Sequence, residues 1–198
     1  MFWYEDEIRR LEKEGSKIGY QPETVFYGSS SIRLWDSLHN DFKALKPVNL
    51  GFGGSTLAAC VWYFERVMTP YHPKKLVVYA GDNDLGDGRH PEEIFIFFQQ
   101  LVARTAKRFG GIPCYFVSLK PSISRHHMLD QYKFTNMIIE KEIKGYNNNW
   151  HFIDIYNKMV DSNGYPQKQY FLDDGLHLSK SGYQVWKQVI GNYINTNP

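Results

Sequence analysis

The chain is poor in cysteine and lacks the sequon for N-linked glycosylation. Its 198 residues include only two thiols, Cys60 and Cys114, and no Asn-x-Ser/Thr acceptor occurs. Two thiols cannot build a disulfide framework, and they cannot supply the ligands of a Cys-based zinc module. The composition therefore excludes both the disulfide-stapled class of small secreted domains and the Cys-based zinc proteins.

Long apolar stretches and long basic stretches are also missing. No apolar run approaches the ~20 residues that span a bilayer, and the charged segment 1–14 has no signal-peptide core. The 23 basic and 21 acidic residues give a net charge of +2, and no basic run exceeds two residues. We therefore expect neither a membrane nor a nucleic acid as a partner. The sequence as written predicts a cytoplasmic protein, whereas a removed leader would imply a secreted or periplasmic one.

The residues that are present indicate one compact domain. Domains typically hold roughly 100–200 residues, so 198 residues that are 42% hydrophobic predict a single domain with a sizeable core. Aromatic side chains reach 16%, which we interpret as packing in the core and on the surface. The predicted domain spans residues 1–198, and residues 1–20 form an N-terminal helical extension. The sequence does not indicate an oligomeric state.

Five apolar runs predict β-strands. Most of them are continuous rather than alternating, which is typical of parallel strands that are covered on both faces. The predicted strands are Thr24–Tyr27, Val48–Leu50, Leu76–Ala80, Cys114–Leu119 and Trp150–Ile155. Helical patterns alternate with them, at Glu5–Lys13, Thr56–Met68, Glu92–Phe109, Asp130–Lys144 and Ser179–Ile194. This alternation predicts an α/β fold, a three-layer α/β/α sandwich around a parallel sheet.

Polar residues with catalytic chemistry follow the predicted strands. In such sheets, ligands bind beyond the carboxyl ends of the strands. The first strand is followed by a serine cluster, the second by a glycine loop and the third by Gly-Asp-Asn-Asp, and an Asp-Asp-Gly-Leu-His segment precedes the last helix. A serine, a glycine loop, an asparagine and an Asp-x-x-His motif are thus expected to meet at one edge.

Each of these residue types has a role in acyl transfer. A serine such as Ser30 becomes a nucleophile when a neighbouring histidine, here His177, takes its proton. Asp174 lies three residues before His177, a spacing that allows its carboxylate to orient the imidazole. The oxyanion of a tetrahedral intermediate needs preorganised donors. The candidates are the N–H of Ser30, the N–H of Gly54 and the side-chain amide of Asn83.

Motifs for nucleotides and metals do not fit the sequence. The segment 51–56 has glycines like a dinucleotide loop, but Thr56 stands where the third glycine belongs, and no Gly-Lys-Ser/Thr P-loop occurs. The segment 82–87 resembles a calcium loop, but Gly86 occupies a ligand position and Asp87 the glycine position. We therefore expect no metal site and no cofactor.

The four blocks together resemble the SGNH hydrolases, also called the GDSL-like esterase/lipase family. The family's Ser, Gly, Asn and His correspond to Ser30, Gly54, Asn83 and His177, and the similarity runs from about residue 25 to residue 183. The resemblance implies a flavodoxin-like fold with five parallel strands in the order 2-1-3-4-5. The sequence departs from the common Gly-Asp-Ser form at Ser29, which we interpret as a trait of a Gly-Ser-Ser-Ser branch.

The sequence thus predicts a serine esterase that acts through an acyl-enzyme. The expected substrate is a short-acyl ester, small or carbohydrate-borne, of the O-acetyl type. The alternatives are a lysophospholipase or thioesterase of the same family and a non-catalytic carbohydrate-binding module on the same fold. Trp35, Phe52 and Tyr79 flank the motifs and are interpreted either as pocket residues or as core residues. The serines of the cluster also suit helix capping, a role that we assign to Ser31.

Overall fold

A parallel five-stranded sheet forms the centre of the computed structural model, which describes residues 1–15, 17–145 and 149–197. The strand order is β2-β1-β3-β4-β5, the order that the family resemblance implies. The strands are β1 (Thr24–Gly28), β2 (Pro47–Gly51), β3 (Lys75–Tyr79), β4 (Cys114–Val117) and β5 (Trp150–Ile153). All five predicted strands are confirmed, and their bounds move by at most two residues.

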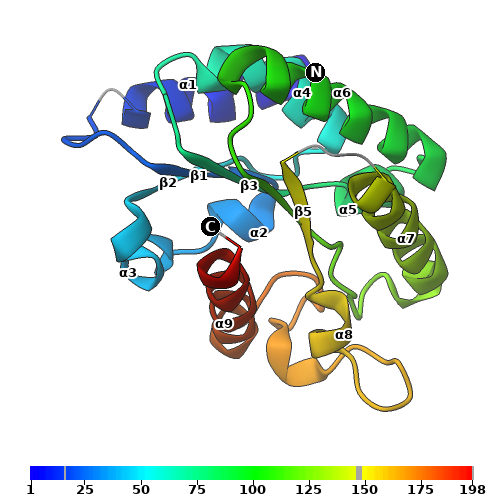
Figure 1. Cartoon of the computed structure of the whole chain (residues 1–198). Helices are drawn as coiled ribbons and strands as arrows, with labels where there is room; N and C mark the ends of the chain where they lie inside the picture. The colour runs from blue at the N-terminus through cyan, green and yellow to red at the C-terminus, as the bar shows by residue number, and fades with distance from the viewer. Residues whose placement is uncertain (16, 146–148, 198) are drawn as a thin grey trace.

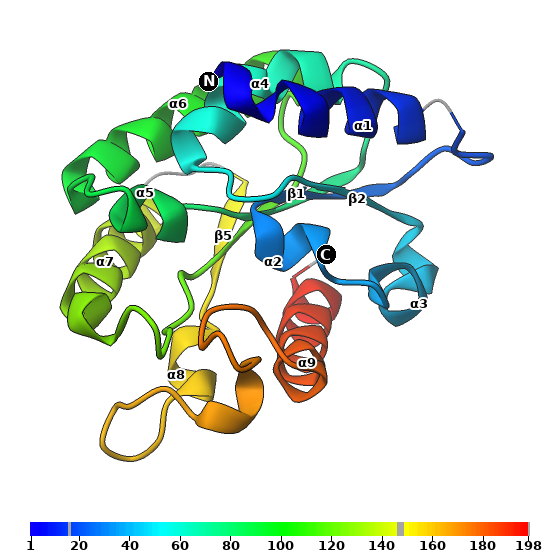
Figure 2. The same cartoon turned by 180° about the vertical axis from the view of Figure 1, so that it is seen from behind.

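Helices cover both faces of this sheet. Figures 1 and 2 show α1, α4 and α6 along one face and α2, α3 and α9 along the other, while α7 packs beside α6 and against β5. Residues of β1 and β3 are almost entirely buried because both sides of these central strands are covered. The long helices are α1 (Glu5–Gly15), α4 (Leu57–Met68), α6 (Pro91–Phe109), α7 (Leu129–Gly145) and α9 (Lys180–Thr196). The predicted α/β/α sandwich is confirmed.

The long helices begin where capping groups satisfy their first N–H groups. Thr56 accepts a hydrogen bond from Ala59 N at the start of α4, and Ser179 accepts one from Gly182 N at the start of α9. Both caps have extended backbone, so each helix starts one residue later than its sequence pattern predicts. None of the described helices combines the length and the apolar character that a bilayer crossing requires.

Short helical turns complete the fold, some of them at the carboxyl edge of the sheet. The one-turn α-helices are α2 (Ser30–Arg33), α3 (Leu38–Asp41), α5 (Asp82–Gly86) and α8 (Tyr156–Met159). The 3-10 turns are η1 (Phe2–Tyr4), η2 (Lys43–Leu45), η3 (His126–Met128) and η4 (Lys168–Tyr170). Two of these turns, α2 and α5, start directly at the carboxyl ends of β1 and β3, so they hold the residues that follow those strands.

The N-terminal helix packs into the fold. Ile8 and Leu11 of α1 are buried in the core, and Arg66 on α4 pairs with Glu5 and Glu12 of α1. These contacts hold α1 on the same face as α4, next to the loop that follows β2. The first residues of the chain therefore reach the neighbourhood of the predicted site.

Candidate active site

The register of the sheet brings three of the predicted blocks to one edge. Gly28 at the end of β1 lies opposite Gly51 of β2 and Tyr79 of β3, so the following segments leave the sheet side by side. Gly28 has a φ of +143°, and a Cβ there would lie 1.8 Å from the Tyr79 carbonyl oxygen. Glycine is required at this position, since no L side chain fits both the backbone angle and the space. The tight turn at Gly28, where the chain leaves β1, places the serine cluster against the end of β3.

The three consecutive serines differ in their access to solvent. Ser29 is 0% exposed and Ser31 is 2% exposed, whereas Ser30 is only half-buried at the first position of α2. Ser29 donates its backbone N–H to the Tyr79 carbonyl oxygen, which fixes the turn. Ser31 lies inside α2, whose cap position is Ser29, which corrects its assignment as a helix cap. Its backbone oxygen accepts a hydrogen bond from the Tyr183 hydroxyl at 3.1 Å. Of the three side chains, only that of Ser30 is open to an incoming substrate.

Asp174 and His177 form a hydrogen-bonded pair in the loop before α9. The distance from His177 Nδ1 to Asp174 Oδ2 is 2.6 Å, and Asp174 Oδ1 accepts the backbone N–H groups of Leu176 and His177. Burial alone would raise the pKa of Asp174, but these three donors lower it to about 2. An ionised carboxylate only accepts hydrogen bonds, so Nδ1 carries the proton. The other ring nitrogen, Nε2, is then left as a base.

The histidine bonds to Asp174 and not to the acid beside it. Asp173, the neighbouring acid, is exposed, and the bond to the imidazole comes from Asp174, as the spacing predicts. Among the described residues, no hydrogen bond joins the Ser30 hydroxyl to His177. Catalytic hydrogen bonds are often long in a free enzyme and shorten when substrate binds.

The glycine loop after β2 is anchored from two sides. Asp84 of α5 accepts hydrogen bonds from Leu57 N at 2.6 Å and Ala58 N at 3.4 Å, which fixes the start of α4. Burial raises the pKa of Asp84 to about 6, against the opposing effect of these donors. Gly54 is exposed and has a φ of +67°, and its carbonyl accepts the hydroxyl of Tyr4 at 3.0 Å.

The N-terminal helix supplies the second anchor of this loop. Glu7 of α1 accepts the backbone N–H of Gly53 at 3.0 Å and pairs with Arg33 of α2 at 2.9 Å. Arg10 donates to the carbonyl oxygen of Gly51 at 2.9 Å. Helix α1 thus joins the glycine loop to the short helix that carries Ser30. No sequence motif indicates these contacts, because they join residues that are 26 to 46 positions apart.

Asn83 lies on α5 and points its amide at the glycine loop. Its Nδ2 donates to the Ser55 carbonyl oxygen at 3.1 Å, and its Oδ1 accepts a hydrogen bond from Arg125 at 3.1 Å. Asn83 is 9% exposed, and one of the two Nδ2 protons is still available for a ligand. In the described chain, the backbone N–H groups of Ser30 and Gly54 also donate to no protein acceptor. Two unengaged backbone N–H groups and the second proton of Asn83 Nδ2 therefore belong to the predicted oxyanion site.

A buried ion pair lies beside Asn83. Lys120, which follows β4, is 1% exposed, and its Nζ lies 3.7 Å from Asp82 Oδ2. The same oxygen accepts the hydroxyl of Tyr79 at 3.1 Å. Burial lowers the pKa of Lys120, and the Asp82 carboxylate counteracts part of that effect. The Lys-Pro-Ser stretch at residues 120–122 was the only sequence signal that could have pointed to this pair.

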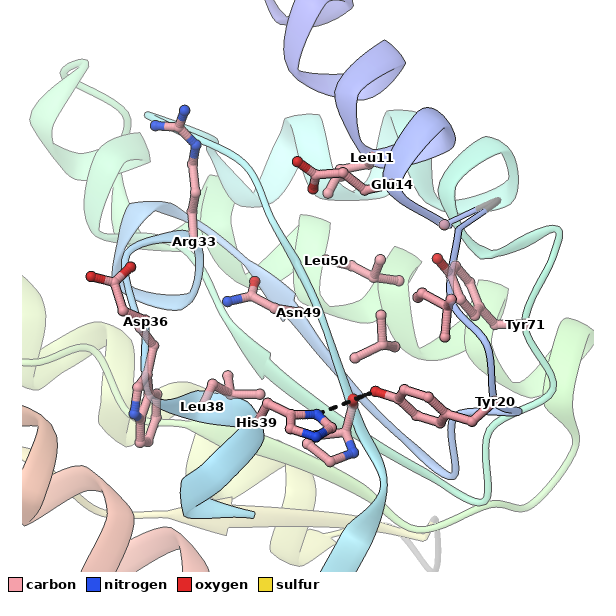
Figure 3. A pocket seen from close by; sticks show the side chains of 15 residues that line it. Leu11, Glu14, Tyr20, Arg33, Asp36, Leu38, His39, Asn49, Leu50 and Tyr71 are labelled. Atoms are coloured by element: carbon pink, nitrogen blue, oxygen red, sulfur yellow. Dashed lines mark hydrogen bonds between the residues drawn. The ribbon is translucent and has the colours of Figure 1, made fainter. Parts of the chain in front are cut away.

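The aromatic residues that flank the motifs belong to the core. Trp35, Phe52 and Tyr79 are at most 1% exposed, which corrects their interpretation as walls of an open substrate pocket. Trp35 does border a hollow of about 330 Å³ along β2, shown in Figure 3 with Tyr20 and His39. This hollow is lined by none of the predicted catalytic residues. The side chains of Trp35, Phe52 and Tyr79 are all core residues, which was the other interpretation of them.

A more apolar groove lies next to the catalytic segments. It has a volume of about 480 Å³, and its apolar walls are Leu34, Leu172, Leu178 and Tyr183. The N–H of Leu34 donates to the Ser30 carbonyl oxygen, and that of Leu172 donates to the His177 carbonyl oxygen, both at 2.8 Å. The groove is thus lined by near neighbours of the serine and the histidine, whereas Ser30, Asp174 and His177 themselves do not line it.

Comparisons with known proteins agree with this geometry. Residues 19–185 match the GDSL-like Lipase/Acylhydrolase family. Among curated proteins, none matches. A GDSL-like lipase from Bacteroides thetaiotaomicron is 21% identical, with a TM-score of 0.81 over 96% of this chain and 98% of that one. A Streptococcus pneumonia protein, proposed to be a platelet activating factor, is 18% identical, with a TM-score of 0.85 over 96% and 91%.

An acetyl esterase mutant with an acetate ion is more distant. It is 13% identical, with a TM-score of 0.70 over 87% of this chain and 96% of that one. At these identities the solved structures establish the fold, and the family match covers most of the chain. Because the family match covers residues 19–185, the chain belongs to the GDSL-like lipase/acylhydrolase family of SGNH hydrolases, a family of ester hydrolases.

Proposed function

We propose that this protein is a serine esterase that cleaves carboxylic esters with short acyl groups. The observation that carries the proposal is the Asp174–His177 pair, with its 2.6 Å hydrogen bond, together with Ser30 as the one half-buried serine in a cluster whose other two serines are buried. The family supplies ester hydrolysis as the general reaction. The assignment of individual residues and of the acyl length is the proposal.

The proposed reaction has two halves. His177 Nε2 takes the proton of the Ser30 hydroxyl as Oγ bonds to the ester carbonyl carbon, and the carbonyl oxygen becomes an oxyanion. The N–H groups of Ser30 and Gly54 and Nδ2 of Asn83 stabilise that charge. The imidazolium then protonates the leaving alkoxide, which departs and leaves an acyl-enzyme. A water molecule, deprotonated by His177, attacks the acyl carbon. The bond from that carbon to Oγ then breaks, and the imidazolium returns its proton to Oγ, which releases the acid and restores the serine.

The polar loops at the site support short acyl groups, because among the described residues there only the groove offers apolar contact. Its volume of about 480 Å³ falls within the range of small-molecule sites, and its leucines offer apolar contact. The loops around the site are brief and polar, and the segment 120–130 carries Arg125, His126 and His127. An O-acetyl or butyryl ester, free or on a carbohydrate, fits these dimensions. The acetyl esterase among the structural neighbours is consistent with this substrate class.

The acyl-length preference can be measured directly. With p-nitrophenyl esters from acetate to palmitate, we expect kcat/KM to be highest for acetate or butyrate and to fall beyond about eight carbons. A methylene contributes ~0.8 kcal/mol only where it is buried in the groove. The methylenes of a longer chain would lie against the polar loops and desolvate them, which lowers kcat/KM. Leu172→Ser should lower kcat/KM for butyrate more than for acetate, whereas Ile96→Ser, on α6, should change neither. A steady rise of kcat/KM towards palmitate would instead favour the lipase-type alternative.

The asparagine donor gives a second prediction. Asn83→Ala should lower kcat by about 10²–10³-fold with little change in KM, because an oxyanion donor acts mainly in the transition state. Steady-state kinetics with p-nitrophenyl acetate measure both parameters, and thermal melting reports folding. An unstable variant whose folded fraction keeps the wild-type kcat would show that Asn83 is structural.

A further inference from the structure

Arg125 joins the loop after β4 to the turn that carries Asn83. Its Nη1 donates to the Asp82 carbonyl oxygen at 2.8 Å, and its Nη2 donates to Asn83 Oδ1 at 3.1 Å. The guanidinium lies over Gly86, where a Cβ would approach its Cζ to 2.7 Å. The absence of a side chain at Gly86 therefore leaves space for this head group. The planar fork of an arginine suits two acceptors on one turn, which a lysine could not hold together.

These contacts leave the Asn83 amide a single favourable orientation. An asparagine amide can rotate by half a turn, which exchanges its oxygen and its nitrogen. Arg125 can only donate, so it requires the oxygen at one end, and the Ser55 carbonyl can only accept, so it requires the nitrogen at the other. A charged donor on Oδ1 also polarises the amide, which makes Nδ2–H a stronger donor.

The segment that carries Arg125 also holds the histidine loop. The backbone N–H groups of Ile123 and Ser124 donate to the Gly175 carbonyl oxygen, at 2.9 and 3.1 Å. Gly175 lies between Asp174 and His177 in the sequence. One short segment therefore ties the proposed oxyanion donor and the proposed acid–base pair to each other.

We infer that Arg125 is a positioning residue of the proposed esterase, and that it acts by orienting and polarising the Asn83 amide towards the oxyanion. The inference rests on the proposed function, since the oxyanion belongs to acyl transfer. Arg125 contributes through Asn83 and not through the substrate. Its effect should therefore depend on whether Asn83 is present.

A double-mutant cycle with p-nitrophenyl acetate tests this dependence. Arg125→Met should lower kcat by about tenfold to a hundredfold, as expected for a displaced catalytic group, with KM changed by less than about twofold. In the Asn83→Ala background, the same substitution should change kcat by less than about twofold, because the group it positions is gone. Equal losses in both backgrounds, or no loss in the wild-type background, would overturn the inference. Arg125→Gln replaces Arg125→Met if the latter does not fold.

The matched control is an arginine that holds backbone carbonyls far from the site. Arg108 donates to the carbonyl oxygens of Met68 and Thr69, so Arg108→Met removes a similar clamp. It should lower thermal stability and leave kcat unchanged. A kcat loss in Arg108→Met as large as that in Arg125→Met would assign both effects to stability alone.

An activity-independent measurement separates this inference from the proposed function. The side-chain amide NMR signals of Asn83 are assigned by their disappearance in Asn83→Ala. They should shift in Arg125→Met and stay in place in Arg108→Met. A wild-type protein that hydrolyses no ester would refute the proposed function, while unchanged Asn83 signals in Arg125→Met would refute the positioning role.

Discussion

Ser30→Ala is expected to abolish ester hydrolysis, with a loss in kcat on the order of 10⁶-fold, as when a triad nucleophile is removed. The variant lacks the oxygen that forms the acyl-enzyme, while the oxyanion donors and the groove stay in place. A fluorophosphonate probe should label the wild type at Ser30 and leave the variant unlabelled. The stability of the variant should be unchanged within about 0.5 kcal/mol, because the half-buried hydroxyl makes no hydrogen bond within the described chain.

The neighbouring serines are the internal controls for this result. Ser29→Ala should keep activity, since the Ser29 hydroxyl is buried and has no hydrogen-bond partner among the described residues. Ser31→Ala should keep activity as well, because Tyr183 bonds to the backbone of Ser31 and not to its side chain. Peptide mapping that located the phosphonate adduct on Ser29 or Ser31 would contradict the assignment of the nucleophile.

Asp174→Ala should lower kcat by roughly 10⁴-fold, less than the loss from His177→Ala. The imidazole of the variant loses the acceptor that keeps the proton on Nδ1 and the charge that stabilises the imidazolium. Because the pKa of Asp174 is about 2, its carboxylate is ionised throughout the neutral range. The wild type therefore has the charged carboxylate at every pH between about 5 and 9. We expect the rate of the Asp174→Ala variant to be lower than that of the wild type across this whole range.

Two further variants separate the electrostatic role of Asp174 from its structural one. Asp174→Asn keeps an oxygen that can accept the N–H groups of Leu176 and His177, but it offers the imidazole an amide in place of a carboxylate. It should lose nearly as much activity as Asp174→Ala while it keeps the fold. Asp173→Ala should be close to wild type, because Asp173 is exposed and the bond to His177 comes from Asp174. A larger loss in Asp173→Ala than in Asp174→Ala would refute the pairing.

The sheet and the long helices could be predicted because each leaves a periodic signal. A buried parallel strand such as β3 is apolar at nearly every position, and a long helix such as α6 repeats its apolar residues over several turns. One-turn helices such as α2 and α5 are too short to show any period. They form because the chain leaves a strand through a tight glycine turn, which is a tertiary constraint.

The proposed catalytic residues could be predicted for a similar reason, since Ser30 and Asn83 follow strand ends and a three-residue spacing joins Asp174 to His177. Their supports could not be predicted in this way. The bonds from Arg125 to Asn83 and from Glu7 to Gly53 span more than 40 positions, and they depend on how loops cross the sheet edge. The pocket interpretation of Phe52 and Tyr79 failed because proximity to a motif in sequence does not determine on which side of the backbone a side chain lies.

The attachment of α1 to the glycine loop makes this edge of the protein sensitive to dissolved salt. Glu7 and Arg33 form one of the ion pairs in that attachment, and both side chains are partly exposed. Exposed pairs contribute about 0–1 kcal/mol each, and salt screens them over a Debye length of about 8 Å at physiological ionic strength. An uncharged ester is not itself attracted or repelled by this screening. We therefore expect ionic strength to change the rate of the proposed reaction by loosening the contact between α1 and the loop that contains Gly53 and Gly54. It should not change the rate at which substrate meets the protein.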